Sequence, residues 1–77
     1  MNLDIFISHF SELFDETPAS EISATTAFHN LDEFSSLTAL SIIAMIDEQY
    51  EVTLKGDDIR RAITVEDLFN IVKERRG

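Results

Sequence analysis

Residues 34–50 read FSSLTALSIIAMIDEQY and predict the central helix of the fold. Apolar residues recur in this segment every three or four positions, which is the spacing of a helix face. Ser35 is the expected N-cap, because its hydroxyl can accept a hydrogen bond from a free N–H one turn into the helix. We therefore expect a helix that runs from about Ser36 to Gln49 or Tyr50.

This predicted helix is apolar around much of its circumference. One row, which we assign to the core, contains Ile42, Ile46 and Tyr50. The apolar residues on another side are Leu37, Leu40, Ile43 and Ala44. The acidic residues at its end are Asp47, Glu48 and Glu51. Such a helix is either contacted on several sides or presents an apolar patch to a partner or a ligand, and both interpretations stay open here.

An earlier helix is predicted over roughly residues 2–15. Its apolar stripe consists of Leu3, Phe6, Ile7, Phe10, Leu13 and Phe14. Pro18 and the small polar residues after it are expected to end the helix. Residues 16–34 then form a long connection. This first loop is expected to pack onto the helices, because it contains Ile22, Phe28, Leu31 and Phe34.

The rest of the chain predicts one extended segment and two more helices. Residues 51–54 are expected to be extended, and Gly56 opens a short helical turn that reaches about Ala62. Thr64 can cap a last helix. The buried stripe of that helix is Val65, Leu68, Phe69 and Val72. We therefore predict one all-α domain over residues 1–77, with three main helices, one short helix and a long first loop.

Charge is distributed unevenly over the chain. The net charge is −9, and all six Lys and Arg residues lie in residues 55–77. The acidic first part should repel nucleic acid and anionic membranes and attract basic protein patches, although acidic charge also simply keeps a small protein soluble. No apolar run is long enough to span a bilayer. The N-terminus lacks the basic region of a signal peptide, so we expect a cytoplasmic protein.

Residues that support catalysis or metal binding are sparse. The chain has no cysteine, and its two histidines are His9 and His29. Neither lies in a cluster with metal-ligand spacing or is placed by sequence to activate a serine, so we expect both on the surface or half-buried. Asp57-Asp58 lacks the alternating oxygen ligands of a calcium loop. We therefore expect no metal site and no enzymatic activity.

Ser36 is the residue whose position suggests a function. A phosphoryl group on it would lie at a helix N-terminus, where free N–H groups and the helix dipole favour negative charge. The loop that ends there should leave the site exposed. The alternative is that Ser35 and Ser36 are plain N-terminal residues of a helix, with no further role.

Three segments together resemble the acyl carrier protein family, which includes the peptidyl carrier domains. They read LDEFSSL at residues 31–37, IDEQYEVTL at residues 46–54 and ITVEDL at residues 63–68. In that family Asp-Ser-Leu starts the second helix, where this chain has Ser35-Ser36-Leu37. The resemblance covers nearly the whole chain and implies an acyl-carrier-like four-helix bundle. It also implies that Ser36 carries 4′-phosphopantetheine from coenzyme A and holds an acyl or aminoacyl group as a thioester.

The chain departs from the family pattern in two places. Ser35 stands where the family usually has Asp, and both residues can cap a helix. Thr38 and Ser41 stand where fatty-acid carriers are often acidic. The start of the helix is thus less charged than in those carriers. This favours dedicated partners in a secondary lipid or polyketide-type pathway over primary fatty-acid synthesis.

The resemblance further implies roles for residues around the serine. The hypothesised anchors of a partner face are Leu37, Leu40 and Ile43, with acidic contacts at Asp47, Glu48 and Glu51. The residues expected to border a cargo cleft are Ile59, Ala62 and Ile63. Acidic contacts of this kind set the association rate and the choice of partner, and they weaken with salt.

The implied partners are a phosphopantetheinyl transferase and acyltransferase, ketosynthase or adenylation enzymes with basic docking patches. A discrete, monomeric carrier suits brief docking of this kind. The alternative is an adaptor that keeps the carrier fold, is never modified and binds a partner through its acidic, apolar second helix.

Overall fold

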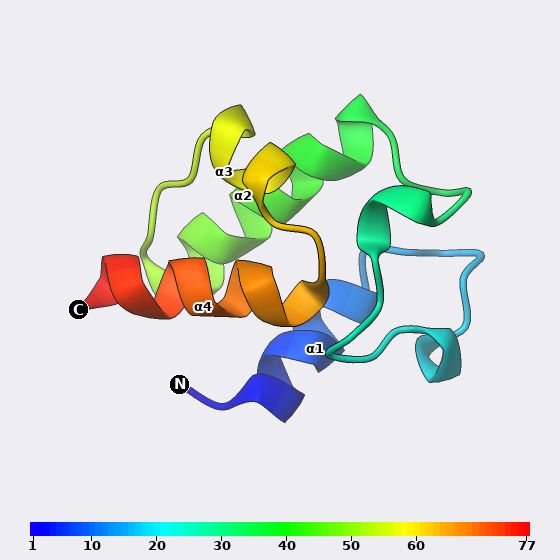
Figure 1. Cartoon of the computed structure of the whole chain (residues 1–77), viewed down its shortest axis with the longest axis horizontal. Coiled ribbons are helices and arrows are strands. Elements are labelled where there is room, and N and C mark those ends of the chain that lie inside the picture. The colour runs from blue at the N-terminus through cyan, green and yellow to red at the C-terminus, as the bar shows by residue number, and fades with distance from the viewer.

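The computed structural model describes residues 1–77 as four α-helices joined by loops (Figure 1). The helices are α1 (Leu3–Ser11), α2 (Ser36–Tyr50), α3 (Gly56–Arg61) and α4 (Val65–Arg76). Two short turns of 3-10 helix, η1 (Ala19–Glu21) and η2 (Phe28–Asn30), interrupt the first loop. The prediction of an all-α bundle with three main helices, one short helix and a long first loop is confirmed.

Helices α2 and α4 form the centre of the bundle, because each of them packs against the other three helices. The predicted core row of α2 is buried, as is the predicted stripe of α4. The largest side chains with almost no exposed surface are Phe6, Phe10, Phe28, Ile42, Ile46, Ile59, Leu68, Val65 and Val72. They come from all four helices and from η2, so the short α3 and the first loop are part of the core.

Aromatic rings connect α1 to the first loop. Phe10 lies edge-on to Phe28, with ring centroids 5.5 Å apart, and Phe28 is edge-on to Phe34 at the same separation. Contacts of this geometry add to the stability that burial of the rings provides. The row ends at Phe34, just before α2 begins. The first loop therefore positions the residues that precede Ser36.

The first loop is also bonded to the beginning of α4. The backbone N–H of Val65 donates to the Thr26 carbonyl at 3.1 Å, and that of Glu66 donates to the Ala24 carbonyl at 2.9 Å. These N–H groups belong to the first turn of α4, where no intrahelical acceptor exists. The expectation that the loop packs onto the helices is thus confirmed.

Helix α1 is shorter than predicted, because it ends at Ser11 and not near residue 15. The N–H groups of Leu13 and Phe14 bond three residues back, to the carbonyls of Phe10 and Ser11, and a side chain far along the sequence holds the residues that follow. The Glu33 carboxylate accepts hydrogen bonds from the backbone N–H groups of Asp15 and Glu16, at 2.8 and 2.9 Å, and from the Thr17 hydroxyl at 2.9 Å. These bonds keep residues 15–17 out of a helical path, and Pro18 is not what ends the helix, because the helix has already ended at Ser11.

The later element boundaries agree with the predictions except at one residue. Helix α2 spans the predicted residues, and α3 ends one residue before Ala62. Thr64 caps α4 in a capping box with Asp67, as expected. Glu51, however, is not extended: its φ of 56° places it in the left-handed region, where it terminates α2. Residues 52–55 form no helix or strand, and Lys55 at their end has an extended backbone.

Candidate functional site

Ser35 and Ser36 have different environments although they are neighbours. Ser35 has an extended backbone, and its hydroxyl accepts a hydrogen bond from the Thr38 N–H at 3.3 Å. It is the N-cap of α2, as predicted. Ser36 is the first residue of the helix, and its exposed hydroxyl makes no hydrogen bond within the protein. The hydroxyl of Ser36 is therefore free to carry a group, whereas that of Ser35 has a structural role.

The backbone around Ser36 favours a negative charge. The N–H groups of Ser36 and Leu37 have no acceptor in the structure, because the first turn of a helix offers none. The dipole of the 15-residue helix α2 adds a partial positive charge at the same end. A phosphodiester on the Ser36 hydroxyl would thus be stabilised by its surroundings.

A cleft of about 460 Å³ opens beside the two serines, between α2 and α3. The residues that line it are His29, Phe34, Ser35, Ser36, Ala39, Leu40, Ile43, Gly56, Ile59 and Arg60. Half of these residues are hydrophobic. The structure therefore places a partly apolar cleft next to an exposed serine. Helix α2, which carries the serine, forms one wall of the cleft, and α3 forms the opposite wall.

Comparison with protein-family models matched residues 4–72 to the family described as "Phosphopantetheine attachment site". The chain belongs to this family. Its members carry 4′-phosphopantetheine attached covalently, and they are generally non-catalytic carriers that interact with a phosphopantetheinyl transferase and with biosynthetic enzymes. Comparison with curated proteins and with solved structures found no match.

The geometry around Ser36 fits the family's prosthetic group. The hydroxyl is exposed and unengaged, the two N–H groups beside it lack acceptors, and a partly apolar cleft opens beside it. The group itself supplies a thiol, which this cysteine-free chain does not have. The residues that would hold the group here are Ser36, through its hydroxyl, and the N–H groups of Ser36 and Leu37.

The predicted partner-face residues form two groups along α2. The apolar residues lie in the turns next to Ser36, and the acidic residues lie near the other end of the helix. Leu37 and Leu40 are 76% and 62% exposed, which is unusual for leucine in a small domain. Ile43 is half-buried and lines the cleft together with Leu40. The acidic residues Asp47, Glu48 and Glu51 are all exposed near the other end of α2. Leu37 and Leu40 thus form an apolar patch with carboxylates further along the same helix.

The three residues predicted to border a cargo cleft are placed differently from one another. Ile59 lines the cleft beside Ser36. Ala62 is buried, but it does not line the cleft. Ile63 is 65% exposed and lies outside it, because α3 has already ended and the Ile63 N–H bonds to the Asp67 carboxylate at 3.2 Å. The structure therefore brings only Ile59 of these three to the serine.

His29 lines the cleft, and this position was not predicted from the sequence. Its Nε2 lies 2.9 Å from the Ile59 carbonyl oxygen and 2.9 Å from the Ala62 carbonyl oxygen. Both neighbours are acceptors only, so Nε2 carries the hydrogen and donates to them. These partners lie 30 and 33 residues further along the chain, and no local pattern could have revealed them.

An ion pair between the buried Asp58 and the partly exposed Arg75 holds the other side of α3. The Asp58 carboxylate accepts from the Arg75 guanidinium of α4 at 2.6 and 3.2 Å, and from the Lys55 N–H at 2.9 Å. The Arg75 hydrogen bonds, helped by the Lys55 N–H, hold the pKa of Asp58 below its ordinary value. Asp58 is thus a structural residue and belongs to no calcium loop.

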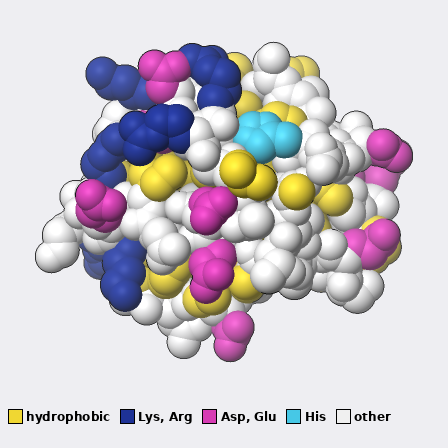
Figure 2. Space-filling model, viewed as in Figure 1, with side chains coloured by type: hydrophobic (Ala, Val, Ile, Leu, Met, Phe, Trp, Pro, Cys, Tyr) yellow, Lys and Arg dark blue, Asp and Glu magenta, His cyan; other side chains and the backbone are white.

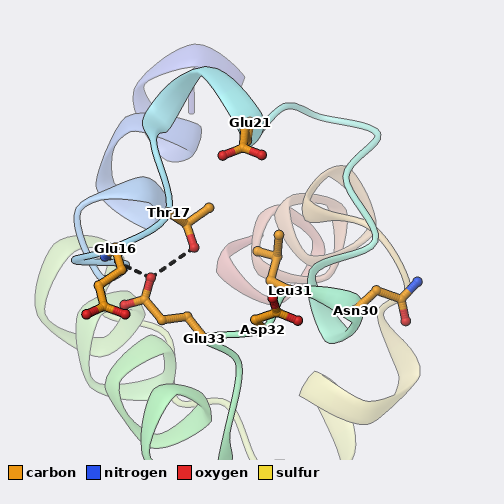
Figure 3. Close-up of a pocket in the computed structure, with 7 residues that line it drawn as sticks. All are labelled: Glu16, Thr17, Glu21, Asn30, Leu31, Asp32 and Glu33. Atoms are coloured by element: carbon orange, nitrogen blue, oxygen red, sulfur yellow. Dashed lines mark hydrogen bonds between the residues drawn. The ribbon is translucent and has the colours of Figure 1, made fainter.

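A second hollow, of about 450 Å³, lies on the loop side of the molecule (Figure 3). Its lining includes Glu16, Glu21, Asp32 and Glu33, with Leu31 as the one hydrophobic residue. Burial alone would raise the pKa of Glu33, but the hydrogen bonds from Thr17 and the nearby backbone outweigh it and lower that pKa. No group of three His, Asp or Glu side chains in the protein is arranged to hold a metal ion.

The surface charge follows the sequence asymmetry. Figure 2 shows the Lys and Arg side chains gathered on the left, over the end where α3 and the C-terminus lie in Figure 1. Carboxylates occur across the same view, and on its right side they are the only charged side chains. None of the helices has the length and apolar composition that crossing a membrane requires.

Proposed function

We propose that the protein is an acyl or aminoacyl carrier whose 4′-phosphopantetheine arm is joined to the Ser36 hydroxyl by a phosphodiester bond. The main observation that supports this proposal is the contrast between the two serines. The Ser35 hydroxyl caps α2, whereas the Ser36 hydroxyl is exposed and makes no hydrogen bond. The family match supports the same group. The arm, derived from coenzyme A, holds its cargo as a thioester, and the chain itself catalyses no reaction.

The proposed docking surface for partner enzymes is centred on Leu37 and Leu40. Their exposure beside Ser36 gives a partner two apolar anchors close to the arm. Ile43 continues this surface into the cleft, and Asp47, Glu48 and Glu51 provide acidic contacts for a basic patch. Such charges raise the association rate and allow rapid release. A monomeric carrier in the cytoplasm suits this mode of docking.

The proposed partners are a phosphopantetheinyl transferase and acyltransferase, ketosynthase or adenylation enzymes of a secondary lipid or polyketide-type pathway. Thr38 and Ser41 support this choice, because they leave the first turns of α2 without a carboxylate. The cleft between α2 and α3 is the proposed place for the cargo, with Ile59 in its wall. Ala62 and Ile63 would take part only indirectly, because neither lines it.

A second candidate function is that of an adaptor that is never modified. The observation that favours it is Ser35, which stands where the family usually has Asp and which a transferase would have to accept. An adaptor would use Leu37 and Leu40 to bind its partner and would not need the Ser36 hydroxyl.

Intact mass separates these two functions. The protein is incubated with coenzyme A and a broad-specificity phosphopantetheinyl transferase, as wild type and as the Ser36→Ala and Ser35→Ala variants. We expect the mass of one phosphopantetheine on wild type and Ser35→Ala, and none on Ser36→Ala. Ser35→Ala is the matched control, because it removes the neighbouring hydroxyl from the same turn.

The result that would contradict the carrier function is unchanged mass on folded wild-type protein. That experiment is repeated with a transferase from the same source as the protein, since Ser35 replaces the usual Asp. Added mass that persists in Ser36→Ala would instead place the attachment at another hydroxyl.

A further inference from the structure

Helix α3 is the weaker wall of the cleft. It has six residues, which is too short for a helix to be stable by itself in water. Apart from its apolar contacts, two polar ties hold it. Asp58 pairs with Arg75 of α4, and His29 of the first loop bonds to carbonyl groups at the end of α3.

The tie made by His29 is well defined. The last carbonyl groups of a helix have no intrahelical donor, and the Nε2 hydrogen of His29 is shared between two carbonyls at this end, those of Ile59 and Ala62. The ring is stacked on Phe28 with centroids 4.4 Å apart and is edge-on to Phe34 at 4.8 Å. These rings restrict the orientation of the imidazole, which directs its N–H at the two carbonyls.

The same histidine lines the cleft. His29, Phe34 and Ile59 are all among its lining residues, so the imidazole connects the loop wall directly to the α3 wall. The opposite wall is formed by Ala39 and Ile43 on α2. The width of the cleft therefore depends on where His29 holds Ile59 against α2.

We propose that His29 determines which acyl groups the cleft accepts, because it fixes α3 at a set distance from α2. The inference rests on the proposed function, in which the acyl group is tethered at Ser36 at the mouth of the same cleft. With His29 in place the cleft takes straight acyl chains up to a defined length and excludes longer ones. Without the tie, α3 moves away from α2 and longer chains enter.

The test uses protein loaded at Ser36 with butyryl, hexanoyl, octanoyl or decanoyl pantetheine arms. Cleavage of each thioester by hydroxylamine is followed by mass, and protection is the ratio of the rate for the free acyl pantetheine to the rate for the loaded protein. The variants are His29→Val, which has no donor, and His29→Gln, whose amide N–H₂ can still donate to the carbonyls. Arg75→Gln is the matched control, because it loosens α3 from α4 with no change in the cleft lining.

We expect wild type to protect one chain length best. In His29→Val the protection of that chain should fall about fivefold, the factor that corresponds to the net contribution of one hydrogen bond, and the maximum should move to a longer chain. His29→Gln should keep the wild-type maximum. Arg75→Gln should lower the thermal midpoint without moving the maximum.

Two results would overturn the proposal. One is a chain-length profile in His29→Val that matches wild type at normal loading, and the other is an equal shift in Arg75→Gln. Hydrogen exchange of the α3 amides in the unmodified protein gives a separate readout: it should accelerate in His29→Val and much less in His29→Gln. Failure to load would contradict the proposed function, whereas unchanged α3 exchange would contradict the role of His29 alone.

Discussion

Helices α2 and α3 form opposite walls of one cleft, but they are stabilised in different ways. Helix α2 has 15 residues, its own N-cap at Ser35 and a buried row that includes Ile42 and Ile46. Helix α3 has six residues and depends on side chains from the first loop and from α4. The residue proposed to carry the arm thus lies on the self-sufficient wall, and the wall whose position is proposed to select the cargo is the one held by side chains from other elements.

The largest expected effect is on the free energy of unfolding, when one buried isoleucine from each wall of the cleft is replaced by alanine. Ile46 on α2 and Ile59 on α3 are 0% and 2% exposed, so their contacts with the core are similar in extent. Ile46→Ala should lower the free energy of unfolding by about 4 kcal/mol, because the long helix cannot move into the space. Ile59→Ala should cost only about 2 kcal/mol, because α3 can shift toward α2. Urea unfolding measures both values.

An equal cost for the two substitutions would break the comparison between the helices. It would show that α3 is as firmly positioned as α2. A smaller cost for Ile46→Ala than for Ile59→Ala would reverse the assignment of the rigid wall.

The next effect concerns the ion pair that holds α3 to α4. Asp58→Asn should lower the free energy of unfolding by about 2 kcal/mol, because the charged hydrogen bonds to Arg75 are lost while the side chain keeps its size. Asp57→Asn is the matched control. The Asp57–Arg60 pair is exposed, so its loss should cost at most about 0.5 kcal/mol.

The same pair predicts a pH dependence. The pKa of Asp58 is lower in the folded protein than its ordinary value of 3.8, so its contribution is fully present above that value. The contribution is lost as the pH falls through the lowered folded pKa. The difference in stability between wild type and Asp58→Asn should therefore shrink below about pH 3.8. A difference that stays constant at pH values well below 3.8 would contradict this assignment.

The two walls also differ in how far the sequence predicts them. The limits of α2 follow from local features, namely the cap at Ser35 and the spacing of Ile42 and Ile46, and these were predicted correctly. The capping of α4 by Thr64 was local as well. To predict that the Ser36 hydroxyl is exposed, it was enough to know that Ser36 directly follows the N-cap residue.

The features that sequence reasoning missed depend on partners far along the chain. Glu33 binds the N–H groups of Asp15 and Glu16, which were predicted to lie at the end of the first helix. His29 reaches α3 through bonds that span 30 residues or more, and Ile63 leaves the cleft because α3 ends before it. Hydrophobic spacing carries no information about such contacts, since they are made by polar groups brought together by the fold.

A smaller effect is expected at the N-terminus of α2. Ser35→Ala should lower the free energy of unfolding by about 1 kcal/mol, because the Thr38 N–H loses its acceptor. Ser35→Asp should restore this loss, since an aspartate caps equally well and its charge favours the helix dipole. Ser36→Ala is the control and should be nearly neutral, because the Ser36 hydroxyl makes no hydrogen bond. A larger cost for Ser36→Ala than for Ser35→Ala would contradict the division of roles between the two serines.

The smallest effect is expected at the other end of α2, and it has the opposite sign. The Tyr50 hydroxyl is buried without a hydrogen-bond partner, and burial raises its pKa above the ordinary 10.0 despite the opposing effect of Arg76. Tyr50→Phe removes this unpaired group and keeps the ring against Phe6, so it should raise the free energy of unfolding by about 0.5 kcal/mol.

The alkaline side of the stability curve separates this cause from a general gain in packing. A tyrosine whose folded pKa is raised contributes stability that is present below pH 10.0 and is lost as the pH rises through the folded pKa. Wild type should therefore lose stability above pH 10.0 faster than Tyr50→Phe does, and the gap between them should widen. Parallel curves would mean that the hydroxyl ionises as easily in the folded chain as in the unfolded one. The last turn of α2 thus carries the one buried side-chain oxygen or nitrogen atom that has no hydrogen-bond partner, although the helix is otherwise self-sufficient.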